Sequence, residues 1–342
     1  MTHHTGLLAY FAPLDGIPQP ALGRHILGTV AFGETTGLSL TAQGHPELAI
    51  PMSSPGFASF REVWTTRVKP EVGLRGELAY AHDGEYLFVS GAIEPLGVYG
   101  PKVREVYESA FALVEELGYP HIFRMWNFVG DIIGSNAEGQ EIYQDFVAGR
   151  AEAFASYGDG AGYMPAATGI GTRGEGISFT LLACREGRPQ HLENQRQTPA
   201  YHYPEQYGPK PPSFARATRL HPAGARYGDG PLFVSGTASI LGHETVHRGD
   251  VVKQTEVVLD NIAELIGGRN LAAAGLDEGH ELKDVRLVKV YVRHDEDLPV
   301  VRAQCRDSFG PDAEIVYLNV AVCRNDLLVE IEGLVPGPEL SR

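Results

Sequence analysis

A pentapeptide, LFVSG, occurs twice in this chain, and the repeat narrows the range of possible folds. It begins at Leu87 and again at Leu232, each time in an apolar run typical of a buried strand. The segments that follow the two copies agree in the order of their elements. The sequence therefore predicts two copies of one unit of strands and helices.

A loop and an amphipathic helix follow each LFVSG. In the first copy apolar residues recur at three- and four-residue intervals up to Leu117, and Gly118 is expected to end the helix. In the second copy Asp250 is expected to cap a helix that runs to Ile266, with Gly267 as its stop. Each helix presents one apolar face, which predicts that it packs against a sheet.

The remainder of each copy agrees as well. HIFRMWNFVGDI and DVRLVKVYVRHD read as strands, and each precedes a shorter helix, one reaching Phe154 and the other Phe309. A proline-led strand then starts at Pro165 and at Pro311, and ISFTLLAC or LLVEIEGL forms the last strand. Strands that outnumber two helices predict the α+β class, with a mixed sheet and both helices on one of its faces.

The length of 342 residues accommodates two such units. We expect residues 1–190 to form a degenerate first copy. Residues 191–342, which include the loop segment 191–230, are expected to form the copy that alone carries a usable active site.

Residues 186–230, between the copies, are rich in Pro, Tyr, Arg and His. One interpretation is a surface linker. The other is a pocket wall that bears Tyr207, Arg216 and Arg219, since this density of arginine is unusual in so acidic a chain. Both interpretations remain open at this point.

The formal net charge of −15 argues against nucleic acid and against an anionic membrane as partner, because both are bound by basic surfaces. No run of about 18 apolar residues is present, and the first residues do not read as a signal peptide. The three cysteines, Cys184, Cys305 and Cys323, lie far apart, which is typical of a reducing compartment. We expect a cytoplasmic protein that binds a small molecule.

The last strand carries two carboxylates, Glu330 and Glu332. Their spacing places both on one face of the strand, about 7 Å apart. A solvated sheet face is one interpretation. However, the corresponding strand of the first copy has no carboxylate, and apolar neighbours would raise a carboxyl pKa toward that of a general acid.

His243 to His247 match the H-E-x-x-H pattern of zinc proteases. That chemistry needs both histidines on one helical face and a third ligand farther on. Here the motif lies in a loop before the helix that Asp250 caps, so we expect no metal site.

Small residues could leave room for a ligand near the second LFVSG. Gly236 is either a close-packing glycine, as Gly91 could be, or a place where a ligand approaches the backbone. Ala238 would share its face of the strand. Cys323 reads as a buried, apolar side chain.

The order LFVSG, helix, DVRLVKVYV, proline-led strand and LLVEIEG resembles the reactive-intermediate deaminase (Rid) fold. The arginine usual in that family falls near Ile315 here and is missing, which disfavours imine hydrolysis. Over nearly its whole length the chain resembles the chorismatases, in which a Rid-like C-terminal domain follows a degenerate copy. The segments that carry this resemblance are YHYPEQYG, FARATRL, LFVSGTASILGHE and VCRNDLLVEIEG.

The resemblance implies an enzyme that cleaves the enolpyruvyl ether of chorismate and releases pyruvate without a cofactor. Glu330 matches the family's acid, and Tyr207 and Arg216 match contacts to the substrate carboxylates. Gly236 with Cys323 resembles the pair found in enzymes that form 3-hydroxybenzoate. The Rid likeness leaves a monomer or a homotrimer open.

Two alternatives accompany this hypothesis. The first is a chorismate hydrolase that yields pyruvate and 3,4-dihydroxycyclohexa-1,5-dienoate. The second is a non-catalytic protein that binds a small acid.

Overall fold

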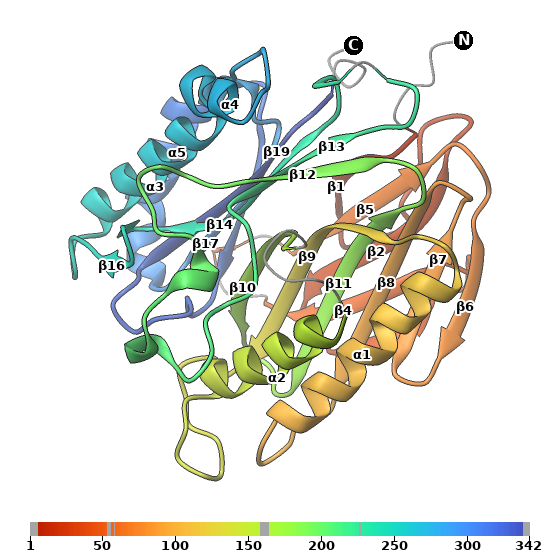
Figure 1. Cartoon of the computed structure of the whole chain (residues 1–342), viewed down its shortest axis with the longest axis horizontal. Helices are drawn as coiled ribbons and strands as arrows, with labels where there is room; N and C mark the ends of the chain where they lie inside the picture. The colour runs from red at the N-terminus through yellow and green to blue at the C-terminus, as the bar shows by residue number, and fades with distance from the viewer. Residues whose placement is uncertain (1–5, 53–55, 58, 158–163, 226, 338–342) are drawn as a thin grey trace.

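A computed structural model describes residues 6–52, 56–57, 59–157, 164–225 and 227–337. The strands of these residues form three large sheets and one short ribbon, and the longer helices lie on the outside (Figure 1). None of the described helices has the length and apolar character that crossing a bilayer requires.

The predicted repeat is confirmed by the sheet topology. The first-copy sheet has the order β10-β9-β11-β8-β7-β6, and the second-copy sheet has the matching order β18-β17-β19-β14-β13-β12. In each sheet the first two strands are parallel and the others antiparallel. The strands of the first copy are β6 (Glu71–Arg75), β7 (Leu78–His82), β8 (Tyr86–Ile93), β9 (His121–Gly130), β10 (Ala166–Thr172) and β11 (Ile177–Cys184). Those of the second are β12 (Arg188–Leu192), β13 (Ala217–His221), β14 (Leu232–Ala238), β17 (Leu287–Val292), β18 (Glu314–Asn319) and β19 (Val329–Val335).

The helices cover one face of each sheet, as predicted. α1 (Gly100–Glu116) and α2 (Ile142–Tyr157) pack on the first-copy sheet. α3 (Val251–Ile266) and α5 (Leu298–Phe309) pack on the second, together with the short α4 (Gly268–Ala273).

The predicted ends of the first helix of each copy are also confirmed. The carboxylate of Asp250 accepts a hydrogen bond from the backbone N–H of Lys253 at 3.0 Å, which caps α3. Gly118 has a φ of +78° just after α1, a conformation that favours glycine at a helix end.

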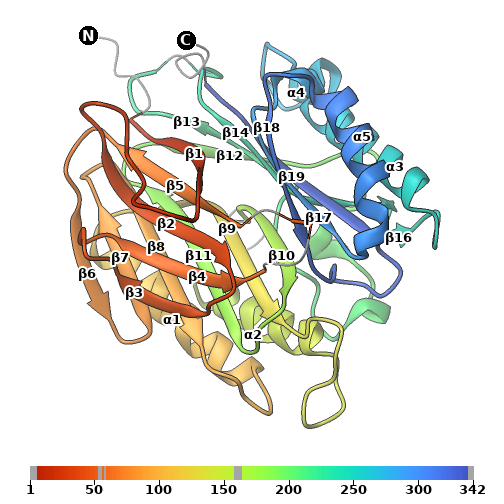
Figure 2. The same ribbon diagram turned by 180° about the vertical axis from the view of Figure 1, so that it is seen from behind.

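Residues 8–66, which the prediction included in the first copy, form a separate sheet that the repeat did not predict. This N-terminal sheet contains β1 (Leu8–Pro13), β2 (His25–Gly33), β3 (Gly37–Leu40), β4 (Pro46–Pro51) and β5 (Phe60–Thr66). It covers the face of the first-copy sheet opposite the helices (Figure 2). Aromatic rings from all three large sheets meet in one core. The ring centroid of Trp64 lies 5.7 Å from that of Trp126 and 6.3 Å from that of Phe233.

The segment between the copies is part of the second-copy sheet and not a free linker. β12 begins at Arg188 and β13 pairs with β14, so two strands of that sheet come from this segment. The proposed division at residue 190 stays a prediction.

A β-bulge distinguishes the second copy from the first. Two residues of β14, Ser235 and Gly236, lie opposite the single residue Glu332 of β19. In the first copy β8 and β11 pair without a shift through Gly91 and Phe179. A bulge takes backbone groups out of the strand ladder and frees them for other partners.

The residues of the bulge join the two copies. The backbone N–H of Gly236 donates to Thr168 Oγ1 at 3.0 Å, and the N–H of Ala167 donates to Ser235 Oγ at 2.9 Å. Strand β10 of the first copy therefore lies against β14 of the second.

The ribbon of β15 (Ile240–Leu241) and β16 (Glu244–Thr245) follows β14.

Candidate active site

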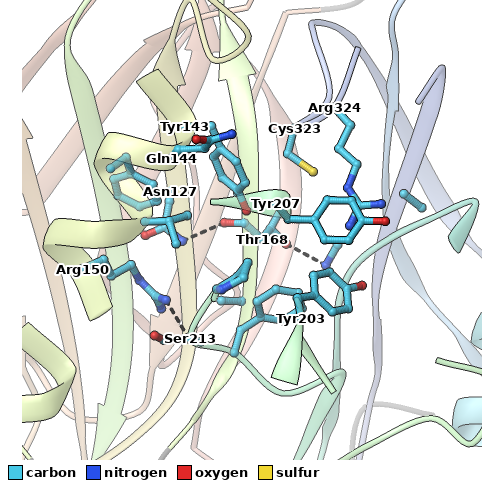
Figure 3. A pocket seen from close by; sticks show the side chains of 18 of the residues that line it. Asn127, Tyr143, Gln144, Arg150, Thr168, Tyr203, Tyr207, Ser213, Cys323 and Arg324 are labelled. Atoms are coloured by element: carbon cyan, nitrogen blue, oxygen red, sulfur yellow. Dashed lines mark hydrogen bonds between the residues drawn. The ribbon is translucent and has the colours of Figure 1, made fainter. Parts of the chain in front are cut away.

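A cavity of ≈ 210 Å³ lies between the two copies, beside the bulge (Figure 3). The second copy contributes residues of the segment before β13, of β14 and of the region from Cys323 to Glu330. The first copy contributes Asn127, Glu141, Tyr143, Gln144, Phe146, Val147, Arg150, Ala167, Thr168 and Gly169. The expectation that the second copy alone builds the site is therefore wrong.

The residues that the sequence singled out meet in this cavity. Its lining includes Tyr207, Arg216, Gly236, Ala238, Cys323 and Glu330. Residue separation along the chain does not predict this meeting. The sheet register does: Ala238 pairs with Glu330 across β14 and β19.

Glu330 is a buried carboxyl group, with 4 % of its surface exposed. Burial, and next the negative charge of Glu332, raise its pKa to about 8, although Arg124 and Arg216 act in the opposite direction. The group is therefore largely protonated at neutral pH, as a general acid must be.

Glycine at position 236 leaves the space that this carboxyl occupies. A Cβ built on Gly236 would collide with Glu330 Oε1 and would lie 3.1 Å from Thr168 Cγ2. The close-packing interpretation of this glycine is therefore supported, with Glu330 and Thr168 as the packed side chains. The approach of a ligand to the backbone of Gly236, which also lines the cavity, stays a prediction.

A cationic and aromatic wall faces the cavity from the second copy. Arg216 Nη2 donates to Tyr203 Oη at 2.7 Å and to the carbonyl of Thr198 at 2.9 Å. The Arg324 guanidinium lies 3.9 Å from the centroid of the Tyr207 ring. Tyr203, Tyr207 and Arg216 all line the cavity, so the pocket-wall interpretation of residues 186–230 is confirmed for Tyr207 and Arg216. It is wrong for Arg219, which lies outside the cavity lining and donates to the carbonyl of Gly230 at 2.5 Å.

The opposite wall comes from the first copy. Buried Arg150, on α2, donates through Nη1 to the carbonyl of Ser213 at 2.6 Å. Within the described residues its Nε has no hydrogen-bond partner, and neither does Nε of Arg216. The Nε of Arg216 lies 4.0 Å from Glu193 Oε2, so this side of the guanidinium is paired with a carboxylate of the protein. Two buried guanidinium groups on facing walls of the cavity suit a ligand that carries two carboxylates.

Asn127 Nδ2 and Tyr143 complete this wall. Asn127 donates to the carbonyl of Thr168 at 2.9 Å and accepts a hydrogen bond from Tyr107 Oη. Burial, with the nearby Cys323 and Glu330, raises the pKa of Tyr143 well above its usual range, so its hydroxyl stays neutral.

Cys323 faces the cavity as a neutral thiol. Burial, and next the charge of Glu330, raise its pKa to about 12. The neutral form disfavours a role as nucleophile, in agreement with its interpretation as a small apolar side chain.

The H-E-x-x-H segment contacts the cationic and aromatic wall of the cavity. His243 Nδ1 lies 3.2 Å from Tyr207 Oη, and the carbonyl of His243 accepts from Arg324 at 2.9 Å. Among the residues that the structure describes, no group of three His, Cys, Asp or Glu side chains is arranged to hold a metal ion.

Sequence reasoning missed Asn127, Tyr143, Arg150 and Arg324. Three of them belong to the first copy, which was expected to contribute no site residue. The one signal in the sequence was an arginine within the largely apolar run Phe146–Phe154, but the sequence does not show that this side chain is buried.

Comparisons with known proteins agree with this picture. A family model described as "Chorismatase FkbO/Hyg5-like, N-terminal" matches residues 62–183. The chain is 53% identical over 330 residues to the 3-hydroxybenzoate synthase of Streptomyces hygroscopicus, covering 96% of this chain and 97% of the relative. It is 46% identical to a chorismatase of Streptomyces rapamycinicus, covering 88% and 89%.

A solved structure is similar as well. The crystal structure of a chorismatase matches with a TM-score of 0.90 and 42% identity, over 96% of this chain and 98% of that one. The similarity thus extends over both copies and over the N-terminal sheet. The chain belongs to the chorismatase family.

Proposed function

We propose that this protein is a chorismatase that splits chorismate into pyruvate and 3-hydroxybenzoate, with Glu330 as the general acid. The observation that carries the proposal is a buried carboxyl group with a pKa raised to about 8, facing a cavity walled by arginines from both copies. A relative with 53% identity is a 3-hydroxybenzoate synthase, which supports the same product.

The first step is protonation of the enol ether. Glu330 donates its proton to the methylene carbon of the enolpyruvyl group, and an oxocarbenium-like species results. The carboxylate left on Glu330 then stabilises that cation from close by. A positioned general acid contributes typically 10²- to 10⁴-fold to a rate.

The second step releases pyruvate. The oxygen of the neighbouring ring hydroxyl forms a bond to the ether carbon while the bond from that carbon to the pyruvate oxygen breaks, and the hydroxyl proton passes to the Glu330 carboxylate. The bond from this oxygen to its original carbon then opens, the former ether carbon loses its hydrogen as a proton and the oxygen gains one, which makes the ring aromatic. No water enters the overall reaction, because the atoms of chorismate equal those of pyruvate plus 3-hydroxybenzoate. The alternative, hydrolysis to the diene-diol, consumes one water.

Binding rests on the cationic walls. Arg216 and Tyr207 on one side and Arg150 on the other provide hydrogen-bond donors for two carboxylates. Gly236, Ala238 and Cys323 leave room for the ring beside Glu330.

The test is incubation of the purified protein with chorismate, followed by chromatography of the products. We expect pyruvate and 3-hydroxybenzoate in equal amounts, and a loss of about 10²- to 10⁴-fold in turnover for Glu330→Gln. Glu244→Gln is the matched control, because Glu244 is exposed and belongs to the H-E-x-x-H segment. Its turnover should equal that of the unaltered protein.

Three outcomes would count against the proposal. Diene-diol in place of 3-hydroxybenzoate would assign the hydrolytic reaction. Binding of chorismate without turnover would indicate a binding protein. Loss of turnover in Glu244→Gln but not in Glu330→Gln would move the chemistry to the histidine motif.

A further inference from the structure

A buried ionic cluster lies behind the wall of the cavity, where the three large sheets meet. Each sheet contributes charged or polar side chains to it. In the described part of the chain its members are Glu62, Arg124, Trp126, Thr168, Lys289 and Glu332, with exposures of 6 % or less for the four charged side chains. The proposed mechanism uses none of these groups.

Glu332 is the centre of the cluster. Arg124 Nη2 at 2.7 Å and the hydroxyl of Thr168 donate to its Oε2, while Trp126 Nε1 and Lys289 Nζ, both at 2.8 Å, lie against its Oε1. Burial raises the pKa of Glu332, but Lys289 and Arg124 outweigh burial, and the net direction is downward. The group is a fixed carboxylate.

The hydrogen bonds of Thr168 agree with an ionised Glu332. Its Oγ1 accepts from Arg124 Nη2 at 2.7 Å and from the backbone N–H of Gly236 at 3.0 Å. Its single hydroxyl hydrogen is therefore directed to Glu332, which accepts it. The bulge, which frees the Gly236 N–H, thus fixes the direction in which Thr168 donates to the carboxylate behind it.

Glu330 lies two residues before Glu332 on the same face of β19, about 7 Å away along the strand. The cluster holds two carboxylates, Glu62 and Glu332, and two cations, Lys289 and Arg124. An ionised Glu330 would add a negative charge that no cation of the cluster balances.

Other groups around Glu330 act more weakly or in the opposite direction. The titratable and charged side chains that act on it or share its cavity are Arg124, Glu141, Tyr143, Arg150, Tyr203, Tyr207, Arg216, Tyr291, Cys323, Arg324 and Glu332. Of these only Glu332 combines a fixed negative charge with a place on the same strand.

We propose that this cluster is the device that positions Glu330 and holds it in its acid form, with Glu332 as the fixed charge and Thr168 as the link between the copies. The inference rests on the proposed function, since it assigns a purpose to the acid form. Glu332 is a positioning residue, because it acts through Glu330, and Thr168 and Arg124 hold Glu332 in place through their hydrogen bonds to it.

The first experiment compares pH profiles of kcat/KM. Replacing Glu332 by Gln removes a like charge, so the falling limb at high pH should move down by about one pH unit or more. Replacing Arg124 by Gln removes an opposite charge, so the limb should move up. Glu47→Gln, which breaks the 2.6 Å ion pair with Arg61 in the N-terminal sheet, is the control and should leave the limb in place.

Shifts of the high-pH limb in opposite directions in the two variants separate a charge effect from structural damage. Damage would lower kcat/KM in both variants, but it would not move the limb down when a negative charge is removed and up when a positive charge is removed. The inference would be overturned if the high-pH limb of kcat/KM stayed in place in both folded variants, Glu332→Gln and Arg124→Gln, or moved in the same direction in both. Circular dichroism establishes which variants fold.

The second experiment is an infrared titration, which needs no turnover. The carboxylic-acid band that Glu330→Gln abolishes should be present at pH 7 in the unaltered protein and should disappear near pH 8. In Glu332→Gln it should disappear at lower pH. A Glu330 already ionised at pH 7, or a band whose titration Glu332→Gln and Arg124→Gln leave unchanged, would refute the inference even if chorismate is cleaved. If chorismate is not cleaved, the proposed function fails while this titration still decides the role of the cluster.

Discussion

β8 of the first copy and β14 of the second carry the same LFVSG, yet their glycines point to opposite faces of their sheets. A Cβ on Gly91 would enter the ring of Phe179 on the helix side, whereas a Cβ on Gly236 would meet the carboxyl of Glu330 in the cavity. The cause is the bulge in β14, which the first copy lacks. One extra residue in a strand turns a packing glycine into a site glycine.

The last strands differ in a related way. On β11 the residues that alternate with the helix-side core are Ser178, Thr180 and Leu182, none of which carries a charge. On β19 the inward positions are Glu330 and Glu332, both buried. The last strand of the first copy thus buries no carboxyl group, whereas the last strand of the second buries two, which costs stability.

The prediction with the largest expected effect concerns the loss of stability caused by burying the Glu330 carboxyl group. The folded-state pKa of Glu330 is about 8, against 4.5 in the unfolded chain, so the unfolded state releases this proton first as pH rises. The contribution of this protonated group to the free energy of unfolding is therefore lost as the pH rises from about 4.5 to about 8. Glu330→Gln should therefore be more stable than the unaltered protein at pH 8 by roughly 4 kcal/mol, at about 1.4 kcal/mol per pKa unit.

Urea denaturation at pH 5 and pH 8 measures this difference, which should shrink toward the lower pH. Thr180→Val is the matched control on β11. The Thr180 hydroxyl is buried without a hydrogen-bond partner among the described atoms, so its removal should change stability equally at both pH values. An equal gain from Glu330→Gln at both pH values would contradict a buried, protonated carboxyl.

The next effect compares the two glycines directly. Gly91→Ala forces a methyl group against the Phe179 ring and against Leu78, 3.0 Å away, in a packed core. It should cost about 1–3 kcal/mol with little change in kcat of the folded protein. The methyl group added by Gly236→Ala meets the movable end of the Glu330 side chain. This variant should therefore lose less stability than Gly91→Ala but more activity. It should also raise the share of diene-diol among the products.

Denaturation curves and product chromatography on the same two variants decide this prediction. If Gly236→Ala lost stability and kept its product, the two glycines would both be packing residues.

The smallest effect tests the contribution of the first copy. Arg150→Met removes a buried guanidinium with an unused Nε from the cavity wall. A hydrogen bond to a charged group is worth about 1.5–3 kcal/mol, so KM for chorismate should rise at least about tenfold.

Steady-state kinetics measures KM and kcat, and Arg104→Met, on the exposed face of α1, is the control. An unchanged KM in Arg150→Met would restore the view that only the second copy binds substrate.

The repeat and the element order could be predicted because they depend on local patterns. Apolar periodicity fixed the helices, and Asp250 and Gly118 marked their ends as expected. The N-terminal sheet could not be predicted, because its strands have no counterpart in the repeat to support their assignment.

The site was predicted in part for a similar reason. Glu330 stood out because two carboxylates in an apolar strand are unusual. Arg150 did not, since its contact with the cavity depends on how α2 packs beside the second copy. The bulge was also invisible, because LFVSG reads the same in both copies and only the pairing of β14 with β19 reveals the extra residue.

The ion pair between Lys289 and Glu62, at 2.6 Å, ties the second copy to the N-terminal sheet. A fragment that began after residue 190 would retain Glu330 yet expose a face built around Lys289 with one of its two counter-charges removed. Stranding a buried charge in this way typically costs about 3–5 kcal/mol. The second copy therefore depends on the N-terminal sheet for a counter-charge to Lys289, and a shortened chain would have to replace Lys289 by a neutral residue to avoid this cost.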